Sequence, residues 1–295
     1  MNLSLSRSFP IAKAALAAAV IACVVALTCS LAGCASGGTG SSSADADNTS
    51  ASTDGKTLRV AMELAYPPFE TKDDAGNPEG LAVDFIRDFG AAYGYDVQIE
   101  NTAWDGLIPS LQSDKADLVI SSMTITDERK QSVDFSDAYA MAQLAILANA
   151  DSGVASIDDL NQPGKKVTVK TGSTGDVYVT KNLTNAEIVR LADESACVTE
   201  VVQGKADGFL YDQLTIYRNH QANPDTTEAV FIPFQDAEEW GIAVKKGNTE
   251  LLDQLNAFIA QSKTDGEFDR LTEKYLADEK KAFDQYGFKW FFDFE

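Results

Sequence analysis

The sequence is poor in the residues on which most hydrolytic and metal sites depend. It contains one histidine, His220, and of its four cysteines only Cys197 lies beyond residue 34. A single cysteine cannot form an internal disulfide or a zinc cluster, so we expect Cys197 to be a small buried side chain on an apolar helix. His220 lies near a predicted helix end, where a solvated side chain is expected. The chain also lacks a phosphate-binding loop, a dinucleotide glycine fingerprint and any metal-ligand spacing. We therefore predict no metal, no cofactor and no catalytic residue.

Positive charge is scarce as well. The 24 Lys and Arg residues are outnumbered by 45 Asp and Glu residues, which gives a formal net charge of −21, and the basic residues are scattered. Without a basic patch, neither a nucleic acid nor an anionic membrane surface is expected as a partner. The 295 residues, 44% of them hydrophobic, nevertheless suffice for one large globular domain or two modest ones.

The N-terminus carries a compartment signal. Arg7 and Lys13 precede an apolar run that ends in small residues, which is typical of a signal peptide. An uncleaved membrane anchor is the alternative, because residues 14–33 could span a bilayer. The run ends in Leu-Ala-Gly-Cys at Cys34, which resembles the bacterial lipobox and implies cleavage before Cys34 and diacylation of its thiol. We predict a lipoprotein signal peptide at 1–33, a Ser-, Gly- and Asp-rich flexible tether at 34–55, and a lipid anchor on the outer face of the cytoplasmic membrane.

From residue 56 onward, strand patterns alternate with helix patterns, which predicts an α/β fold with right-handed crossovers and parallel-rich sheets. The predicted strands are 57–62, 96–101, 116–122, 165–170, 187–192 and 207–212, and the predicted helices are 82–94, 104–115, a helix after 171–176, 196–204, 249–263 and 266–283.

One segment of the sequence occurs in two similar copies. Residues 111–121 and 201–212 both run from a helix end through Lys-Ala-Asp into a strand. Chance could produce such a repeat of Lys-Ala-Asp. If the repeat is structural, it predicts two similar α/β lobes, each with polar groups at the carboxyl end of a strand. Ligands bind outside the carboxyl ends of parallel strands, so the two strand ends should face one cleft.

Several residues near these strand ends suit a zwitterion. Arg129 can hold a carboxylate with two parallel hydrogen bonds, Thr124 could add a donor, and the helix start at 171–174 is a natural anion site. Asp212 would suit an ammonium group, and Tyr66 and Trp104 could flank a side chain. Each residue has a purely structural alternative: Arg129 as an exposed helical arginine, Asp212 as a helix N-cap and Trp104 as a hydrophobic staple.

The C-terminal segment 281–295 is unusually aromatic. Seven aromatic residues lie between Phe283 and Phe294, too many to leave in water. Docking onto a lobe is one interpretation, and contact with a membrane or a partner is the other.

Three segments, "AYPPFE" (65–70), "NTAWDGLIPSLQSDKADLVISSMTITDERKQSVDFSDAY" (101–139) and "WGIAVKKGN" (240–248), resemble bacterial extracellular solute-binding proteins of the polar amino-acid ABC transporter family, type II periplasmic binding proteins of family 3. The resemblance covers roughly residues 56–277. It implies two lobes joined by two hinge crossovers, near 148–152 and 235–240. Lobe 1 would comprise 56–148 and 239–280, lobe 2 would comprise 149–238, and an aromatic tail would follow at 281–295.

The resemblance also implies a binding site. The segment from Ser121 to Arg129 would bind the ligand α-carboxylate, and Asp212 would bind its ammonium group. Glu63 stands where some members that bind basic amino acids carry an acid, although a solvated residue at a strand end is the alternative. The chain departs from the family pattern at Leu81 and Ala82. The implied ligand-binding residues are Glu63, Tyr66, Phe69, Trp104, Ser121, Ser122, Met123, Thr124, Arg129, Ser173, Thr174 and Asp212.

The function so implied is that of the substrate-binding component of an ABC importer. The protein would be a monomer that captures a polar and, through Glu63, cationic amino acid by hinge closure and delivers it to a membrane permease. Two alternatives stay open: an enzyme on the same scaffold, similar to cyclohexadienyl dehydratase, and a ligand-sensing lipoprotein.

Overall fold

The computed structural model describes residues 56–231, 233–286 and 289–294. They belong to one compact unit. The predicted signal peptide, the tether and the lipidation site Cys34 lie outside the described residues, as do 287–288 and 295 of the aromatic tail. Among the helices that the structure describes, none has the length and apolarity needed to cross a bilayer.

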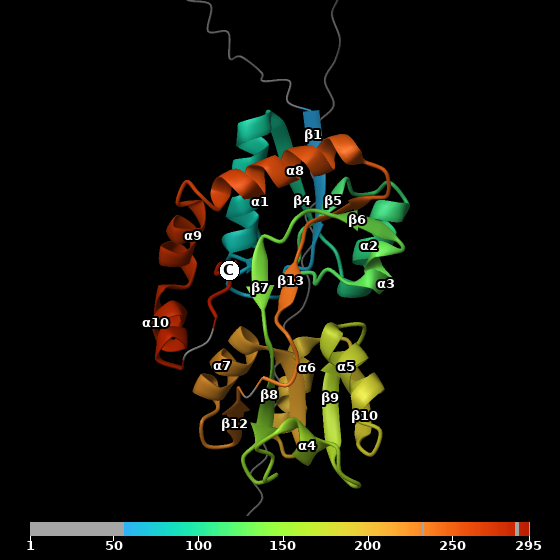
Figure 1. Cartoon of the computed structure of the whole chain (residues 1–295), viewed down its shortest axis with the longest axis vertical. Coiled ribbons are helices and arrows are strands. Elements are labelled where there is room, and N and C mark those ends of the chain that lie inside the picture. The colour runs from blue at the N-terminus through green and yellow to red at the C-terminus, as the bar shows by residue number, and fades with distance from the viewer. Residues whose placement is uncertain (1–55, 232, 287–288, 295) are drawn as a thin grey trace, which may run out of the picture. The chain divides into compact units, whose positions relative to one another are not determined.

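The first lobe is built on a five-stranded sheet. Its strands lie in the order β4-β1-β5-β14-β6, with β1 parallel to β4 and β5, and β14 antiparallel to β5 and β6. Helices flank this sheet (Figure 1). The elements are β1 (Lys56–Met62), β4 (Tyr95–Asn101), β5 (Leu118–Val119), β6 (Val133–Phe135), β14 (Ala243–Lys245), α1 (Leu81–Tyr93), the 3-10 turn η1 (Trp104–Gly106), α2 (Leu107–Gln112), α3 (Asp127–Lys130), α8 (Thr249–Ser262), α9 (Glu267–Tyr275), α10 (Ala277–Tyr286) and the hairpin β2 (Thr71–Lys72) with β3 (Pro78–Glu79).

The second lobe repeats the same plan. Its strands lie in the order β10-β9-β11-β8-β12, with β9 parallel to β10 and β11, and β8 antiparallel to β11 and β12. The elements are β8 (Leu144–Asn149), β9 (Lys166–Lys170), β10 (Glu187–Leu191), β11 (Gly208–Asp212), β12 (Thr227–Val230), α4 (Ile157–Leu160), α5 (Thr174–Asn182), α6 (Glu194–Val202) and α7 (Gln213–Ala222).

Two crossover strands join the lobes, and they pair with each other. β7 (Ala140–Ala142) is antiparallel to β13 (Glu238–Trp240), and both run between the sheets in Figure 1. The second crossover lies within the expected range 235–240. The first does not lie at 148–152, because residues 144–148 already belong to β8 of the second sheet. The apolar run continues from the crossover into β8 with only Gln143 between them, so hydrophobicity alone did not mark the boundary.

The repeated Lys-Ala-Asp segment has the same structure in both lobes. Asp117 accepts a hydrogen bond from Arg59 N on β1, and Asp207 accepts one from Lys166 N on β9, each at 2.8 Å. Both aspartates also form ion pairs, with Arg59 at 2.6 Å and with Lys165 at 2.9 Å. The echo in the sequence therefore corresponds to a structural repeat that fixes the central strand of each sheet.

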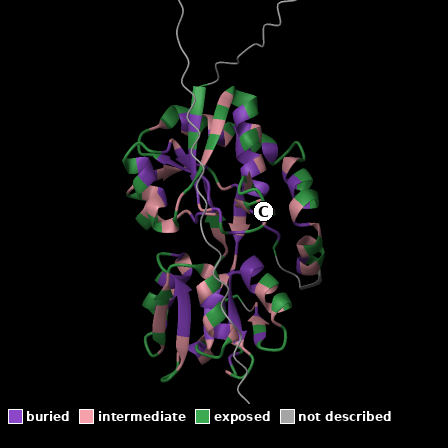
Figure 2. Ribbon diagram, turned by 180° about the vertical axis from the view of Figure 1, so that it is seen from behind, coloured by how far each residue is buried: buried purple, intermediate pink, exposed green. Residues whose placement is uncertain are grey.

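Each lobe has its own core, and the buried residues follow the sheets and the helix faces turned toward them (Figure 2). Leu81 and Ala82, where the chain departs from the family pattern, are fully buried at the start of α1. This helix begins after Gly80, where φ is +134° and a Cβ would lie 2.4 Å from Phe69 O, so that only glycine fits. Cys197 is buried in lobe 2, as predicted. His220, expected to be solvated, is half-buried instead, with Nδ1 3.1 Å from Thr227 O.

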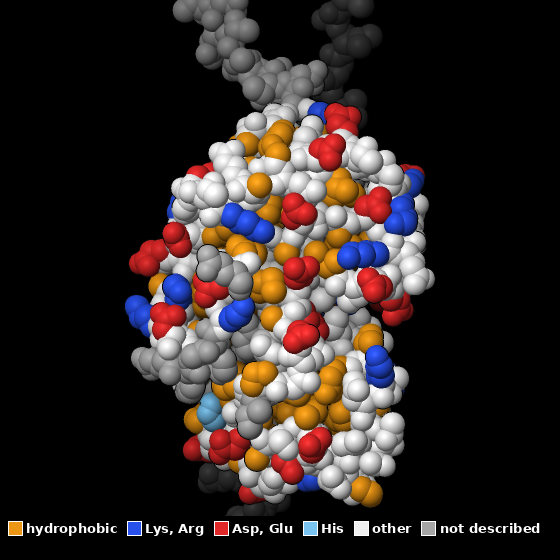
Figure 3. All heavy atoms as spheres, viewed as in Figure 1, with side chains coloured by type: hydrophobic (Ala, Val, Ile, Leu, Met, Phe, Trp, Pro, Cys, Tyr) orange, Lys and Arg blue, Asp and Glu red, His pale blue; other side chains and the backbone are white. Residues whose placement is uncertain are grey.

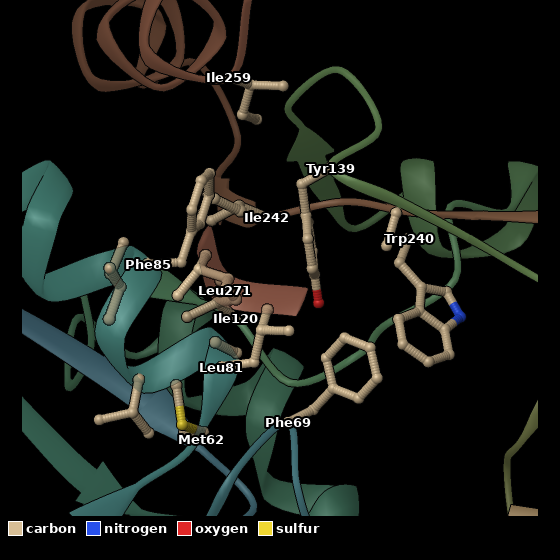
Figure 4. Close-up of a cluster of buried hydrophobic side chains, with 14 of the residues drawn as sticks. Met62, Phe69, Leu81, Phe85, Ile120, Tyr139, Trp240, Ile242, Ile259 and Leu271 are labelled. Atoms are coloured by element: carbon tan, nitrogen blue, oxygen red, sulfur yellow. The ribbon is translucent and has the colours of Figure 1, made fainter. Parts of the chain in front are cut away.

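The described part of the aromatic tail packs onto lobe 1. Trp290 and Phe291 are buried, and Phe291 lies 5.1 Å from Phe69 and 5.6 Å from Trp240 between ring centroids. Met141 N on the first crossover donates to Phe291 O at 2.7 Å. Figure 4 shows Phe69, Tyr139 and Trp240 of the same core side by side. The described residues of the tail are therefore docked on lobe 1 and are not exposed to a membrane.

Candidate functional site

The carboxyl ends of the central strands meet at a polar cavity between the lobes. β1 and β5 end there in lobe 1, and β9 and β11 end there in lobe 2. All the predicted binding residues line this cavity except Phe69 and Met123. Its lining residues are Glu63, Tyr66, Glu70, Trp104, Ser121, Ser122, Thr124, Arg129, Leu144, Ser173, Thr174, Tyr211, Asp212, Glu238 and Trp240.

Phe69 and Met123 support the site from behind instead of lining it. Phe69 is fully buried and stacks on Tyr66 with ring centroids 5.6 Å apart. Met123 is buried in the cluster that includes Leu107 and Leu111. Ser122, directly before Met123, has a φ of +47°, which turns the chain. Ser122 and Thr124 therefore face the cavity, while the side chain of Met123 faces the core.

Asp212 and Tyr66 line the cavity and connect the two lobes. Asp212 is the N-cap of α7 and accepts hydrogen bonds from Leu214 N at 2.9 Å and Thr215 N at 3.1 Å. It also accepts a bond of 2.7 Å from the phenol of Tyr66 in lobe 1. Burial raises the pKa of Asp212, although these hydrogen bonds oppose the shift. The N-cap alternative is thus confirmed, and the same carboxylate also faces the cavity.

Arg129 also lines the cavity, from the short helix α3. Thr126 caps this helix by accepting from Arg129 N at 3.2 Å. The guanidinium donates to Thr124 O at 2.7 Å and, across the lobes, to Gly172 O at 3.1 Å. It lies 5.2 Å from the centroid of the Trp104 ring. Arg129 is therefore a half-buried cavity residue rather than an exposed helical arginine, and burial lowers its pKa.

The start of helix α5, in the second lobe, lines the cavity close to Arg129. Ser173 is its N-cap, accepting from Asp176 N at 3.2 Å, and Thr174 is its first residue. The backbone amides and the positive end of this helix therefore face the cavity beside Arg129.

Glu63 forms an ion pair that the sequence did not reveal. Its carboxylate pairs with Lys170, the last residue of β9, and both side chains are largely buried. Trp104 N donates to Glu63 Oε1 at 3.3 Å, and Lys170 Nζ lies 5.2 Å from the Trp104 ring centroid. Glu63 faces the opposite lobe, so it is not a solvated residue at a strand end. Its charge is balanced by lysine in this structure.

Glu70 adds a buried carboxyl group to the cavity. It is 1% exposed and accepts a hydrogen bond from Ser122 Oγ at 3.1 Å. Burial raises the pKa of Glu70 well above its usual value, and the negative charge of Glu63 adds to this rise. Glu70 is therefore expected to hold its proton more tightly than an exposed glutamate.

Glu238, on the second crossover, occupies the space beside the two predicted carboxylate donors. Its Oε2 accepts from Thr124 Oγ1 at 2.9 Å and from Thr174 Oγ1 at 2.7 Å. Its Oε1 accepts from Gln235 Nε2 at 2.7 Å. One carboxylate of the protein thus contacts both lobes at the point where a ligand carboxylate was expected.

Sequence reasoning missed several of these residues. Tyr211 and Trp240 stood in segments already singled out, at a strand end and in "WGIAVKKGN", so they could have been found. Lys170 ends a predicted strand directly before the helix start at 171–174, which is a weaker signal. Glu70 also stood in a named segment, "AYPPFE", and Glu238 in the expected crossover 235–240, whereas Leu144 carried no local signal.

The cavity is lined both by hydrogen-bond donors and by carboxyl groups, which suits a small molecule that carries both charges. Among the described residues, no group of His, Cys, Asp and Glu side chains is arranged to hold a metal ion. Lys and Arg side chains are also dispersed over the face in Figure 3.

A two-lobed α/β unit with two crossover strands and a polar cavity between its lobes defines the type II periplasmic binding proteins. The chain belongs to the bacterial extracellular solute-binding proteins, family 3, whose family model matches residues 58–278. The family resemblance of the sequence is thus confirmed, and members of this family act outside the cytoplasm.

Named relatives and solved structures agree with this placement. The chain is 37% identical over 258 residues to a probable histidine-binding protein of Neisseria gonorrhoeae, covering 86% of this chain and 94% of that protein. It is also similar to an ancestral arginine-binding protein, bound to arginine or to glutamine, with a TM-score of 0.69 and 37% identity over 75% of this chain and 98% of that one. An ancestral amino acid-binding protein, a precursor of cyclohexadienyl dehydratase, matches with a TM-score of 0.68 and 37% identity over 74% of this chain and 94% of that one.

Proposed function

We propose that this protein is the amino-acid-binding component of an ABC importer. One observation carries the proposal: the guanidinium of Arg129, the start of α5 and the carboxylate of Asp212 line the same inter-lobe cavity. A free amino acid presents a carboxylate and an ammonium group, and burying either charge is costly unless a partner meets it. The site residues are proposed on the same ground: Glu63, Tyr66, Trp104, Ser121, Ser122, Thr124, Arg129, Ser173, Thr174 and Asp212.

The ligand is proposed to be a polar amino acid. Glu63 lines the cavity and pairs with Lys170, so the two side chains offer an acceptor and a donor together. An amide or imidazole side chain can use both groups, whereas a cationic side chain must compete with Lys170 for Glu63. The relative named for histidine, and the ancestral arginine-binding protein bound to arginine or to glutamine, cover this range of side chains.

Transport would proceed by hinge closure. One lobe binds the amino acid first, and closure about β7 and β13 brings the other lobe onto it. The ligand favours the closed form because only that form meets both of its charges, and the closed form docks on the permease. The protein acts as a lipid-anchored monomer, attached through Cys34 to the outer face of the cytoplasmic membrane.

Calorimetric titration tests this function. The purified protein, stripped of bound ligand by unfolding and refolding, is titrated with the twenty amino acids, ornithine and citrulline. We expect saturable binding of one chemical group of amino acids, lost in Arg129→Ala. The matched control is Arg59→Ala, which removes an exposed arginine paired with Asp117 inside lobe 1. Absence of binding by every amino acid would contradict the proposal.

An enzyme on the same scaffold is the second candidate. Two observations favour it: the likeness to a precursor of cyclohexadienyl dehydratase, and the buried carboxyl group of Glu70, whose pKa burial raises. A carboxyl group that stays protonated could act as a general acid that releases a hydroxyl group as water. Incubation with a hydroxylated cyclohexadienyl carboxylic acid, followed by ultraviolet absorbance of the aromatic product, tests this function. We propose that no turnover occurs.

A further inference from the structure

Glu238 takes hydrogen bonds that the proposed ligand would need. Thr124 of lobe 1 and Thr174 of lobe 2 both donate their hydroxyl hydrogens to Oε2 of Glu238, at 2.9 and 2.7 Å. The Thr124 hydroxyl and the helix start at 171–174 were expected to hold the α-carboxylate of an amino acid. A hydroxyl has one hydrogen to donate, so neither threonine hydroxyl can donate to a ligand while it donates to Glu238.

The carboxylate of Glu238 belongs to the crossover strand β13, which joins the two lobes. Glu238 opens β13, which pairs with β7, and Trp240 of the same strand bridges to Thr124. Gln235 holds the second oxygen, Oε1, at 2.7 Å. Both oxygens of Glu238 are therefore held by donors of the protein, as the oxygens of a bound carboxylate would be.

Arg129 retains capacity for a ligand. Its hydrogen bonds go to two backbone oxygens, Thr124 O and Gly172 O, and none of the ion pairs among the described residues includes it. Arg129 and Glu238 nevertheless line the same cavity. A ligand carboxylate that reaches Arg129 therefore arrives beside the negative charge of Glu238.

We propose that Glu238 is an internal substitute for the ligand carboxylate: it connects the two lobes when no ligand is bound and must be displaced by the carboxylate of an amino acid. This inference rests on the proposed function. Glu238 would lower the affinity for every ligand that has a carboxylate, because like charges brought together oppose binding. It would not oppose amines that lack a carboxylate, and so it would determine specificity.

The alternative role for Glu238 is to bind the ligand ammonium group. Its surroundings argue against this role, because the two threonine hydroxyls and the glutamine amide around it are arranged as donors. The partner of the ammonium group is better supplied by Asp212, which lines the same cavity.

Matched ligand pairs distinguish the two roles. L-arginine with agmatine, and L-histidine with histamine, differ only in the carboxylate, so calorimetry of each pair isolates the effect on that group. In Glu238→Gln we expect the dissociation constant of the amino acid to fall at least about tenfold, while that of the amine changes less than about threefold. Glu239→Gln is the control, because it removes the same charge from an exposed position on the same strand. Equal weakening of amino acid and amine, or no change for either, would overturn the inference.

X-ray scattering of the ligand-free protein gives a test that does not depend on binding. Glu238→Ala removes both carboxylate oxygens, so we expect a larger radius of gyration than in the wild-type protein and in Glu239→Ala, with unchanged far-ultraviolet circular dichroism. An unchanged radius would overturn the inference. If the radius grows but no variant binds any amino acid, the proposed function fails while the internal contact stands. If wild type and Glu238→Gln bind an amino acid equally, the function stands and the inference fails.

Discussion

The phenol of Tyr66 in lobe 1 donates a hydrogen bond of 2.7 Å to the carboxylate of Asp212 in lobe 2. The two side chains are 7% and 5% exposed. Because Asp212 also caps α7, this bond attaches the start of that helix to the opposite lobe. The binding cavity, the helix cap and the lobe contact thus share one carboxylate.

Removing that phenol should weaken the closed form. Tyr66→Phe leaves the helix cap intact but deletes a hydrogen bond to a charged group, which is typically worth about 1.5–3 kcal/mol. We expect the affinity for the amino acid to fall about tenfold or more, measured by calorimetry. Tyr95→Phe is the control, because it deletes a phenol bond of 2.8 Å to Gln254 within lobe 1. If both variants bind as the wild type does, Tyr66 has no role in closure.

Lys170 should restrain binding of cationic side chains. Its ammonium group neutralises Glu63, so Lys170→Gln leaves a carboxylate free for a ligand cation and removes a like charge. We expect the affinity for arginine relative to glutamine to rise about tenfold or more. Both titrations are done on the same preparation, because an unpaired buried Glu63 also destabilises the ligand-free protein.

Lys165→Gln is the control for that variant. Lys165 pairs with Asp207 at the start of β9, far along the strand from Lys170, so the same charge change should leave the ratio unaltered. A ratio that stays constant or falls in Lys170→Gln would show that Glu63 does not bind the ligand side chain.

Glu70 should make stability depend on pH. Burial raises its pKa above the usual 4.5, so the folded protein keeps a proton that the unfolded chain releases above pH 4.5. The free energy of unfolding must then fall as pH rises from 4.5 through the folded-state pKa. The glutamine of Glu70→Gln cannot titrate. We therefore expect its free energy of unfolding, measured with denaturant, to depend less steeply on pH between pH 5 and 8 than that of the wild-type protein.

The exposed acid Glu100 on β4 provides the comparison for Glu70. Glu100→Gln should keep the slope of the wild-type protein. A slope that is unchanged in Glu70→Gln would mean that the Glu70 carboxyl group ionises normally in the folded protein.

The aromatic tail should contribute to stability. Phe291 is fully buried against Phe69 and Trp240, so Phe291→Ala is expected to lower the free energy of unfolding by about 3–5 kcal/mol. Phe294→Ala, at the edge of the same cluster and 5.8 Å from Phe268, should cost less. Denaturant unfolding measures both. Equal stability of Phe291→Ala and the wild-type protein would favour the partner-contact interpretation of the tail.

Much of the fold could be predicted because local patterns repeat. Alternating strand and helix patterns predicted the three parallel strands of each sheet but not the antiparallel strands β6, β14, β8 and β12. The repeated Lys-Ala-Asp segment predicted two lobes, because the same aspartate fixes the central strand in each. The first crossover was misplaced, since the apolar residues of β7 and β8 form one nearly continuous run. Docking of the aromatic tail on a lobe was one of two interpretations. A high aromatic content shows that the tail will be buried, but it does not show whether the tail packs on a lobe or on a partner.

The sequence by itself determined which side chains stand at the ends of the central strands. Ser121, Thr124 and Asp212 reach one cavity because parallel strands of each sheet end at the same edge. Only the tertiary structure decided what these groups meet. Glu238 arrives on a crossover strand, and Lys170 and Glu63 come from opposite lobes, so their pairing depends on contacts between distant segments. Whether Phe69 and Met123 face the cavity or the core was decided in the same way, by packing rather than by their neighbours in the chain.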